Sequence, residues 1–337
     1  METILKNKRI LITGGAGSVG GRLAEVILKY DPKTIRIYDM SENEVFKLKT
    51  KFAEENKTQN RVRYLIGDVR DLDRLSLAME NIDYVFHLAA MKHVYACEYN
   101  PFEAVKTNIS GLQNIIDSAR NADVEKVIFT STDKAASPSS VMGMTKLLGE
   151  KLISQANYYK GDKRTVFSSV RFGNVIGSNG SVVPLFKKQI FSGGPLTITE
   201  KEMTRFVITM DEAIELIFSA LRLAKGGETF IWKMRTLKVT DLADAIIKKH
   251  GSGQKIEVDI IGKGEAEKLH EEIMSEEELL RSVEMAGLYV VFPIIDHGGV
   301  KSSHKDVMSI QNPVVISDQG THLSVKDIEK LLEGMEI

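Results

Sequence analysis

The stretch ILITGGAGSVGGRLAEVIL, residues 10–28, joins an apolar run to an amphipathic segment through a glycine-rich turn. Glycines at this spacing let a chain turn tightly and approach a pyrophosphate, whose charge would face the start of the following helix. A glycine triplet alone also fits an ordinary strand–helix turn, but a strand before it and a helix after it favour a dinucleotide-binding loop. The residues predicted to bind the cofactor here are Gly14, Gly17, Ser18, Val19 and Gly20.

The chain around this turn alternates short β-rich runs with longer amphipathic segments. Strands are predicted at 9–13, 34–38, 62–66, 84–88, 126–131 and 165–171, and helices at 20–30, 101–120 and 141–159. Strands alternating with helices predict right-handed βαβ units and a parallel sheet covered on both faces. The expected fold class is therefore α/β, a Rossmann-like doubly wound parallel sheet with a smaller mixed α/β C-terminal substrate lobe.

The regular alternation of strand-like and helix-like segments ends after Asn174. Residues 177–199, GSNGSVVPLFKKQIFSGGPLTIT, are rich in Gly and Ser and indicate a loop-bearing insertion. Further on we expect a helix at 206–223, a strand in GETFIWKM (227–234) that returns to the sheet, and helices at 240–250 and 324–333. The predicted domains are residues 1–174 with 206–235 returning to them, and a second lobe of residues 175–205 and 236–337 that shares a cleft with the first.

Composition limits the function classes. The 337 residues hold 45 Lys and Arg against 46 Asp and Glu, so no basic excess favours nucleic acid or an anionic membrane. A single cysteine, Cys97, rules out an internal disulfide framework and fits a reducing compartment. The first apolar run is too short for a signal peptide, and no run of about 18 apolar residues follows. We expect a cytoplasmic protein with no membrane partner, no nucleic-acid partner and no metal site.

The second strand ends at Asp39, 19 residues beyond Gly20, where a carboxylate can accept hydrogen bonds from ribose hydroxyls. This carboxylate would repel a 2′-phosphate and no arginine follows it, so NAD is favoured over NADP; an ordinary turn aspartate is the alternative. Asp68 and Val69, after the third strand, are predicted to lie near the adenine. The small side chains of Ala89 and Ala90, after the fourth strand, would let the cofactor lie close.

The fifth strand leads into Thr132-Asp133-Lys134, at the sheet edge where ligands of open α/β sheets bind. Burial raises the pKa of an Asp and lowers that of a Lys, which makes Asp133 a candidate acid and Lys134 a candidate base. An exposed ion pair is the alternative. Met142 and Lys146 are four residues apart and share a helix face, so Lys146 could reach a nicotinamide ribose. A surface lysine and a core methionine are their ordinary alternatives.

Seven stretches together resemble one family, the nucleotide-sugar 4,6-dehydratases of the extended short-chain dehydrogenases that act on N-acetylglucosamine. They are TGGAGSVG (13–20), HLAAMKHV (87–94), NPFEAVKTNISG (100–111), STDKAASPSSVMGMTKLLGEK (131–151), RFGNVIGSNGSVVPLF (171–186), MTRFVITMDEA (203–213) and EKLHEEIMSEEE (267–278). Met142 stands where such dehydrogenases usually carry a catalytic tyrosine, and several members of this family share the Met.

The resemblance implies a closed redox cycle. NAD would take a hydride from sugar C4, Lys134 would remove the C5 proton, Asp133 would protonate the departing C6 hydroxyl, and the hydride would return to C6. The acceptor of the C4 hydroxyl proton stays open between Thr132, a water and Lys146. By the same resemblance Asn108 joins the cofactor-binding residues. The implied residues for the nucleotide-sugar substrate are Lys92, Asn174, Ser178, Ser181, Arg205 and Glu267.

One departure from the family pattern concerns the nucleotide. Relatives usually read Arg-x-Gly-Glu-Lys before LHEE, whereas residues 264–268 here read Gly-Glu-Ala-Glu-Lys. The usual nucleotide clamp is thus in doubt, and both UDP- and GDP-sugars stay open, since a related branch making legionaminic-acid precursors uses GDP-sugars. YDMSENE (38–44) with VMGMTK (141–146) resembles the members that retain configuration at C5.

Three further expectations accompany the resemblance. A C5-inverting dehydratase or epimerase on the same substrate is the alternative to retention, and a non-catalytic dinucleotide sensor is the alternative from another class. Family members pair through two helices, so we expect a homo-oligomer formed through residues 101–120 and 141–159.

Overall fold

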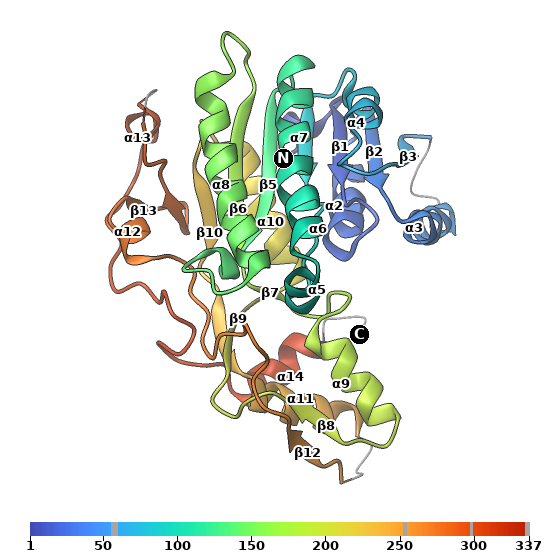
Figure 1. The fold of residues 1–337 in the computed structure, drawn as a ribbon, viewed down its shortest axis with the longest axis vertical. Helices are drawn as coiled ribbons and strands as arrows, with labels where there is room; N and C mark the ends of the chain where they lie inside the picture. Colours follow the sequence, from blue (N-terminus) through green and yellow to red (C-terminus); the bar gives the residue numbers. More distant parts are fainter. Residues whose placement is uncertain (55–59, 252–254, 297–298, 334–337) are drawn as a thin grey trace.

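A nine-stranded sheet with the order β13-β14-β10-β6-β5-β4-β1-β2-β3 forms the centre of the larger lobe (Figure 1). This computed structural model describes residues 1–54, 60–251, 255–296 and 299–333. Seven strands are parallel: β1 (Arg9–Thr13), β2 (Thr34–Asp39), β3 (Val62–Ile66), β4 (Tyr84–His87), β5 (Lys126–Thr132), β6 (Val166–Phe172) and β10 (Thr229–Trp232). β14 (Leu288–Val291) and β13 (Ser282–Met285) add an antiparallel hairpin at one edge. The doubly wound α/β prediction is confirmed.

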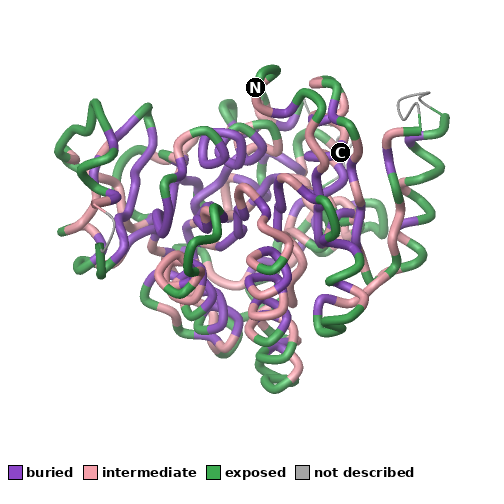
Figure 2. The backbone as a smooth tube through the Cα atoms, turned by 90° about the horizontal axis from the view of Figure 1, so that it is seen from above, coloured by how far each residue is buried: buried purple, intermediate pink, exposed green. Residues whose placement is uncertain are grey.

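Helices cover both faces of this sheet (Figure 1). One face carries α2 (Ser18–Leu28), α3 (Glu42–Glu54) and α10 (Met210–Leu223), and the other carries α4 (Leu72–Met79), α7 (Gly111–Asn121) and α8 (Val141–Tyr159). Ile10 and Ile12 of β1 pack into one core cluster and Leu11 packs into the other. The central strands are therefore buried on both sides, which explains their continuous apolar runs; Figure 2 shows this buried interior beneath helices whose outer sides are exposed.

The smaller lobe lies beyond the carboxyl ends of the central strands (Figure 1). Its sheets are β11 (Arg235–Lys238), β9 (Thr204–Ile208) and β7 (Asn174–Val175), and β12 (Val258–Ile260) with β8 (Leu196–Ile198). Around them pack α9 (Val182–Phe191), α11 (Val239–His250) and α14 (Val325–Glu333). The short helices are α1 (Glu2–Leu5), α5 (Val94–Tyr99), α6 (Pro101–Val105), α12 (Glu276–Leu279) and α13 (Val300–Ser303).

Two expectations for the middle of the chain are wrong. Residues 206–208 belong to β9, and the helix begins only at Met210, because Thr209 caps it and Glu212 completes a capping box. The insertion at 177–199 is more ordered than expected, since it contains α9 and β8. Val182, Val183, Phe186 and Ile190 have helical spacing, and Pro184 is tolerated in a first turn.

Residues 282–291 were expected in the smaller lobe, and the structure places them in the large sheet as β13 and β14. Pairing of β14 with β10 satisfies the backbone groups of what would otherwise be an edge strand. The helix expected at 101–120 is interrupted by a π-helical turn, Lys106–Ser110. The domain division itself stays a prediction.

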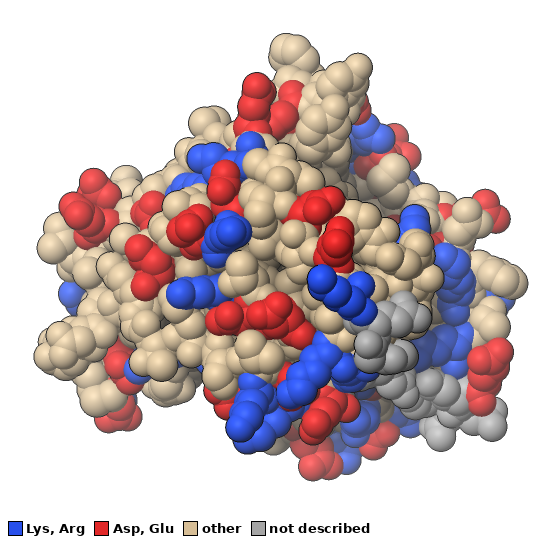
Figure 3. Space-filling model, turned by 90° about the horizontal axis from the view of Figure 1, so that it is seen from below, with Lys and Arg blue, Asp and Glu red and all other residues tan. Residues whose placement is uncertain are grey.

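Charges are mixed over the surface. Figure 3 shows Lys and Arg side chains beside Asp and Glu over the face seen from below, as expected from the balanced composition. Of the helices in the described ranges, none combines the length and the apolar character that a membrane span requires. The described residues also contain no cluster of three or more His, Cys, Asp or Glu side chains that could hold a metal ion.

Candidate active site

The glycine-rich turn between β1 and α2 forms a cradle. Gly14 has a φ of 65°, and a Cβ there would meet the Ala89 backbone nitrogen at 2.7 Å. A Cβ on Gly20 would meet the Gly14 carbonyl oxygen at 2.4 Å. Gly17 precedes α2 as its N-cap without a capping side chain. The residues therefore fit a phosphate group at the start of an 11-residue helix.

Asp39 lies at the end of β2 and braces this turn. Its two carboxylate oxygens accept hydrogen bonds from the Ala16 N–H (3.1 Å) and the Ser41 N–H (3.0 Å). Each oxygen keeps capacity to accept from a ribose hydroxyl. Asp68 is tied into an ion pair with Arg70 at 2.6 Å, and Val69 is buried.

Asn108 lies within the π-helical turn and is buried. Its amide accepts from the Met91 N–H (2.8 Å) and donates to the Met91 carbonyl (3.0 Å) and to Thr145 Oγ1 (2.9 Å). The side chain thus holds the loop after β4, which contains Ala89 and Ala90, against α8. These three contacts use both amide N–H groups and the carbonyl oxygen of Asn108, and its predicted contact with the cofactor stays a prediction.

The tip of β5 holds the candidate acid and base. Asp133 is fully buried, and its Oδ1 accepts from Thr132 Oγ1 (2.8 Å), the Lys134 N–H (2.9 Å) and Lys134 Nζ (3.0 Å). Its Oδ2 has no hydrogen-bond partner among the described residues. The pair is therefore not an exposed ion pair of the loop, which was the alternative reading.

Glu271 is a site residue that the sequence reading missed. It is 2% exposed, and its Oε1 lies 3.2 Å from Lys134 Nζ. Burial lowers the pKa of Lys134, but the charges of Asp133 and Glu271 outweigh burial, so the pKa is raised. The expected lowering of this pKa is therefore wrong for the free protein. The sequence feature that could have indicated Glu271 is the LHEE run (269–272), in which this glutamate lies two residues after the apolar Leu269.

Lys146 reaches from α8 to the end of β5 and donates to the Thr130 carbonyl (3.0 Å). Burial lowers its pKa to about 8. Met142, one turn earlier, is 4% exposed and packs in a small core cluster with Cys97 and Ala104. Met142 therefore packs as a core methionine, the ordinary alternative for this position. It is not among the described residues that line the cavity described next.

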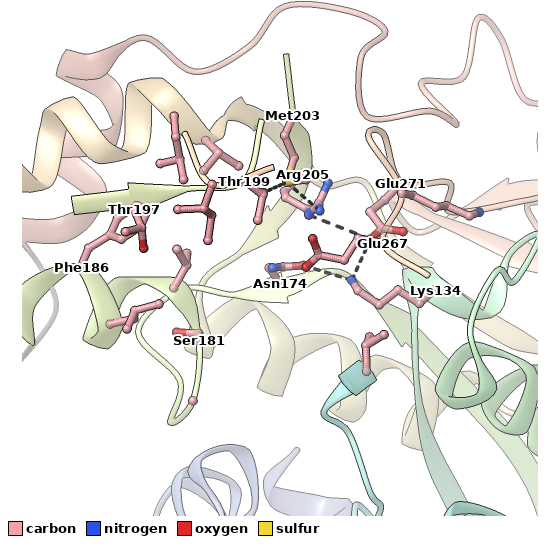
Figure 4. A pocket seen from close by; sticks show the side chains of 18 of the residues that line it. Lys134, Asn174, Ser181, Phe186, Thr197, Thr199, Met203, Arg205, Glu267 and Glu271 are labelled. Carbon is pink, nitrogen blue, oxygen red and sulfur yellow. Dashed lines mark hydrogen bonds and ion pairs between the residues drawn. The ribbon is translucent and has the colours of Figure 1, made fainter. Parts of the chain in front are cut away.

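A cavity of about 620 Å³ lies between the β5 tip and the smaller lobe. Lys134, Asn174 and Glu271 converge on one end of it, with Lys134 Nζ 3.5 Å from Asn174 Oδ1 (Figure 4). Thr197 and Phe186 lie toward the other end, and Thr199 lies between them and Arg205 (Figure 4). Of the residues predicted for substrate, the cavity brings together Asn174, Ser181, Arg205 and Glu267.

Ser181 precedes α9 and lines this cavity. Its buried Oγ has no hydrogen-bond partner in the part of the chain that the structure describes. Arg205 donates to the carbonyls of Thr204 (2.7 Å) and Leu269 (3.1 Å), and its Nε lies 4.0 Å from Glu271 Oε1. The guanidinium therefore already fastens the loop before Glu271, in addition to facing the cavity.

Lys92 and Ser178 are not among the described residues that line this cavity, and their contact with the substrate stays a prediction. Lys92 Nζ donates to the Asn179 carbonyl (2.8 Å), and the Asn179 N–H donates to Ser18 Oγ (2.9 Å). Ser178 Oγ donates to the Val175 carbonyl (2.9 Å). The 177–181 loop thus bridges the phosphate turn and the loop after β4.

The segment that departs from the family pattern closes one side of the cavity. Lys268 Nζ donates to the Ala136 carbonyl (3.1 Å) and to Glu272 Oε1 (3.3 Å). Ser139 Oγ donates to the Ala266 carbonyl (3.2 Å), and Glu267 accepts from the Gly264 N–H (3.3 Å). These contacts attach residues 264–272 to the turn that follows Lys134.

The family follows from a comparison over most of the chain. The family model described as polysaccharide biosynthesis protein matches residues 10–293. The chain belongs to this family.

Similar proteins agree with this family assignment. A Campylobacter jejuni protein named UDP-N-acetylglucosamine 4,6-dehydratase (inverting) is 44% identical over 87% of this chain and 85% of its own. A Rickettsia akari protein named UDP-glucose 4-epimerase is 34% identical over 97% of this chain and 95% of its own. A Methanocaldococcus jannaschii protein, named an uncharacterized membrane protein, is 50% identical over 87% of this chain and 88% of its own.

Solved structures agree with the fold of this family member. Pen from Bacillus thuringiensis superposes with a TM-score of 0.92 at 41% identity, over 99% of both chains. A dTDP-glucose 4,6-dehydratase from Streptomyces venezuelae, solved with NAD, superposes with a TM-score of 0.67 at 21% identity over 77% of this chain and 86% of that one. The second likeness concerns the fold alone.

A buried charge cluster fixes the family member's C-terminal segment beside the site. Arg171 of β6 is fully buried and donates to Glu150 of α8 (2.9 and 2.5 Å), to Glu278 (2.7 and 2.8 Å) and to the Ile273 carbonyl (2.7 Å). Burial lowers the pKa of Arg171, but the two carboxylates outweigh it and raise the pKa. The cluster holds residues 273–278, directly after Glu271, against the large sheet.

Proposed function

We propose that the protein dehydrates UDP-N-acetylglucosamine to a 4-keto-6-deoxy sugar, with NAD as a retained cofactor. The observation that carries the proposal is Lys134 on the cavity wall, paired with the buried Asp133, in a chain 44% identical to a protein named for this reaction. The turn at Gly14–Gly20 and Asp39 would hold the cofactor, which supplies hydride transfer from C4 and back to C6. No nucleic-acid or membrane partner is part of this proposal.

The residues of this chain would move the protons. Lys134 would remove the C5 proton once its own proton has left, and Asp133 would protonate the departing C6 oxygen. Thr132 holds Asp133 in place through its hydroxyl at 2.8 Å. Of the three candidates for accepting the C4 hydroxyl proton, Lys146 is supported by a pKa of about 8, at which an amine exchanges protons readily near neutral pH.

The cavity offers separate places for the sugar and the nucleotide. The sugar would lie beside Lys134 and Asn174, and the diphosphate beside the start of α9 with Ser181, whose buried hydroxyl is unsatisfied among the described residues. Glu267 and Arg205 lie at the same end as Lys134 and Asn174 (Figure 4), so they would contact the sugar or the phosphate next to it. The names of the Campylobacter relatives favour UDP over GDP.

Configuration at C5 is decided by the face from which a proton returns. Retention was expected from the resemblance of two sequence stretches, whereas the Campylobacter relatives, 44% and 43% identical, are named inverting. These names favour inversion at C5, the alternative to retention. The configuration at C5 of the product distinguishes inversion from retention.

Turnover in D₂O tests the function. We expect NAD-loaded protein to convert UDP-N-acetylglucosamine, in preference to the GDP-sugar, into a 4-keto-6-deoxy product with a deuteron at C5. Mass spectrometry reports the lost water, and proton coupling constants report the configuration at C5. Binding of NAD without consumption of either sugar nucleotide would contradict the proposal and favour the dinucleotide sensor.

A second prediction concerns the homo-oligomer. Phe102 of α6, Leu148 of α8 and Tyr99 of α5 are 79%, 47% and 76% exposed, an unusual set of apolar side chains on neighbouring helices. We expect wild-type protein to elute as a dimer or larger assembly, and Phe102→Glu with Leu148→Glu to reduce its mass in light scattering after gel filtration. Phe46→Glu, on the exposed side of α3, is the matched control. A monomeric wild type would contradict this prediction.

A further inference from the structure

Lys134 is shared between two buried carboxylates from distant parts of the chain. Its Nζ lies 3.0 Å from Asp133 Oδ1 and 3.2 Å from Glu271 Oε1, and the third acceptor is Asn174 Oδ1 at 3.5 Å. An ammonium has three N–H donors, so this arrangement uses all of them. A base must lose one of these protons, and the arrangement as it stands favours the charged form.

Glu271 is held in a way that suits this contact. Its N–H donates to Ser317 Oγ (2.9 Å), and its side chain is 3% exposed. Oε2, the oxygen that does not face Lys134, is buried and unpaired among the residues described. Burial, followed by the charge of Asp133, raises the pKa of Glu271 despite the nearby lysine.

The charged groups that face this pair are few. Asp133 approaches from the β5 tip, and Arg205 approaches from β9 with its Nε 4.0 Å from Glu271 Oε1. Arg205 acts in the opposite sense to the carboxylates, because its charge lowers the pKa of both Lys134 and Glu271. Glu267 also faces this end of the cavity (Figure 4), but the ion pairs of Lys134 among the described residues are with Asp133 and Glu271.

We propose that Glu271 is a positioning residue for Lys134: it holds the ammonium between itself and Asp133 and sets the pH at which Lys134 becomes a free amine. The consequence for catalysis rests on the proposed function, in which Lys134 is the C5 base. Glu271 would then receive the Lys134 proton, so that the pair exchanges one proton across the 3.2 Å contact and no net charge is created in the buried site.

Trace acetylation of Lys134 tests this inference without any turnover. NAD-loaded wild type, Glu271→Gln and Glu272→Gln are treated with a small amount of acetic anhydride at pH 8, 9 and 10. Mass spectrometry then compares Lys134 with the exposed Lys29 as internal standard. Glu272 is the matched control because it contacts Lys268 and Ser137.

Removing one adjacent negative charge typically moves a pKa by about one unit or more, so Lys134 should react about tenfold faster in Glu271→Gln at each pH. Glu272→Gln should react like wild type. Equal reactivity in wild type and Glu271→Gln would overturn the proposal, as would an equal rise in Glu272→Gln. Should circular dichroism show that Glu271→Gln does not fold, Glu271→Asp replaces it, with a smaller rise expected and an unchanged rate overturning the proposal.

The result is independent of the proposed function. Protein that does not convert sugar nucleotides would contradict the dehydratase, whereas the acetylation rate reports only on the Lys134 amine. If Lys134 is acetylated faster in Glu271→Gln while the protein converts no sugar nucleotide, the inference about Glu271 stands and only its consequence for catalysis is removed.

Discussion

Lys134→Ala should reduce formation of the 4-keto-6-deoxy product by about 10²–10⁴-fold, the usual contribution of a general base. Lys134 presents its Nζ to the cavity beside Asn174, and no other lysine among the described residues contacts Asp133. The variant should still contain bound NAD after purification, because the predicted cofactor turn lies on β1 and α2. Product is measured by mass spectrometry, and NAD is released by denaturation and quantified.

Lys134→Arg separates the two roles of this residue. An arginine keeps the positive charge between Asp133 and Glu271 but does not lose its proton near neutral pH. We expect this variant to fold with wild-type stability or close to it, and to lose activity and C5 deuteration as fully as Lys134→Ala. Full activity in either variant would remove Lys134 from the mechanism.

Arg171→Met should lower the free energy of unfolding by about 3–5 kcal/mol, as expected when one partner is removed from a buried charge cluster. The substitution leaves Glu150 and Glu278 buried without the guanidinium that each now contacts at 2.9 Å or less. Urea unfolding measures the change. Arg222→Met, which breaks the exposed pair with Glu215, should cost no more than about 1 kcal/mol. Similar losses in both variants would contradict a special role for the cluster.

The same cluster predicts a loss of stability in acid. Burial alone would raise the pKa of Glu278, but hydrogen bonds and charge from Arg171 lower it from 4.5 to about 2. Because the folded-state pKa is the lower one, this carboxylate stabilises the protein fully above pH 4.5 and progressively less toward pH 2. Urea unfolding between pH 5.5 and 2.5 should show this decline in wild type, and a shallower decline in Arg171→Met. Equal slopes would show that the acid loss arises elsewhere.

Local sequence features predicted the sheet and the cofactor turn because both depend on short stretches. The apolar runs around Ile10 and Ile128 read as doubly buried strands, and the turn at Gly14 requires a conformation and a closeness that only glycine permits. The β5 tip was also found from position alone, since the carboxyl ends of parallel strands face the ligand side. In these cases the deciding neighbours lie within about twenty residues.

Glu271, by contrast, is separated from Lys134 by 137 residues, and its contact exists only because Arg171 and the 264–272 segment bring the C-terminal chain back to the large sheet. The direction of the Lys134 pKa shift depends on its neighbours: burial alone predicts a lowered pKa, and the charges of Asp133 and Glu271 together raise it. The sequence by itself determined the doubly wound fold, the phosphate turn and the Asp133–Lys134 pair, because periodicity and glycine spacing are local. Only the tertiary structure decided which charges surround Lys134, because electrostatic interactions depend on distance in space and not on separation along the chain.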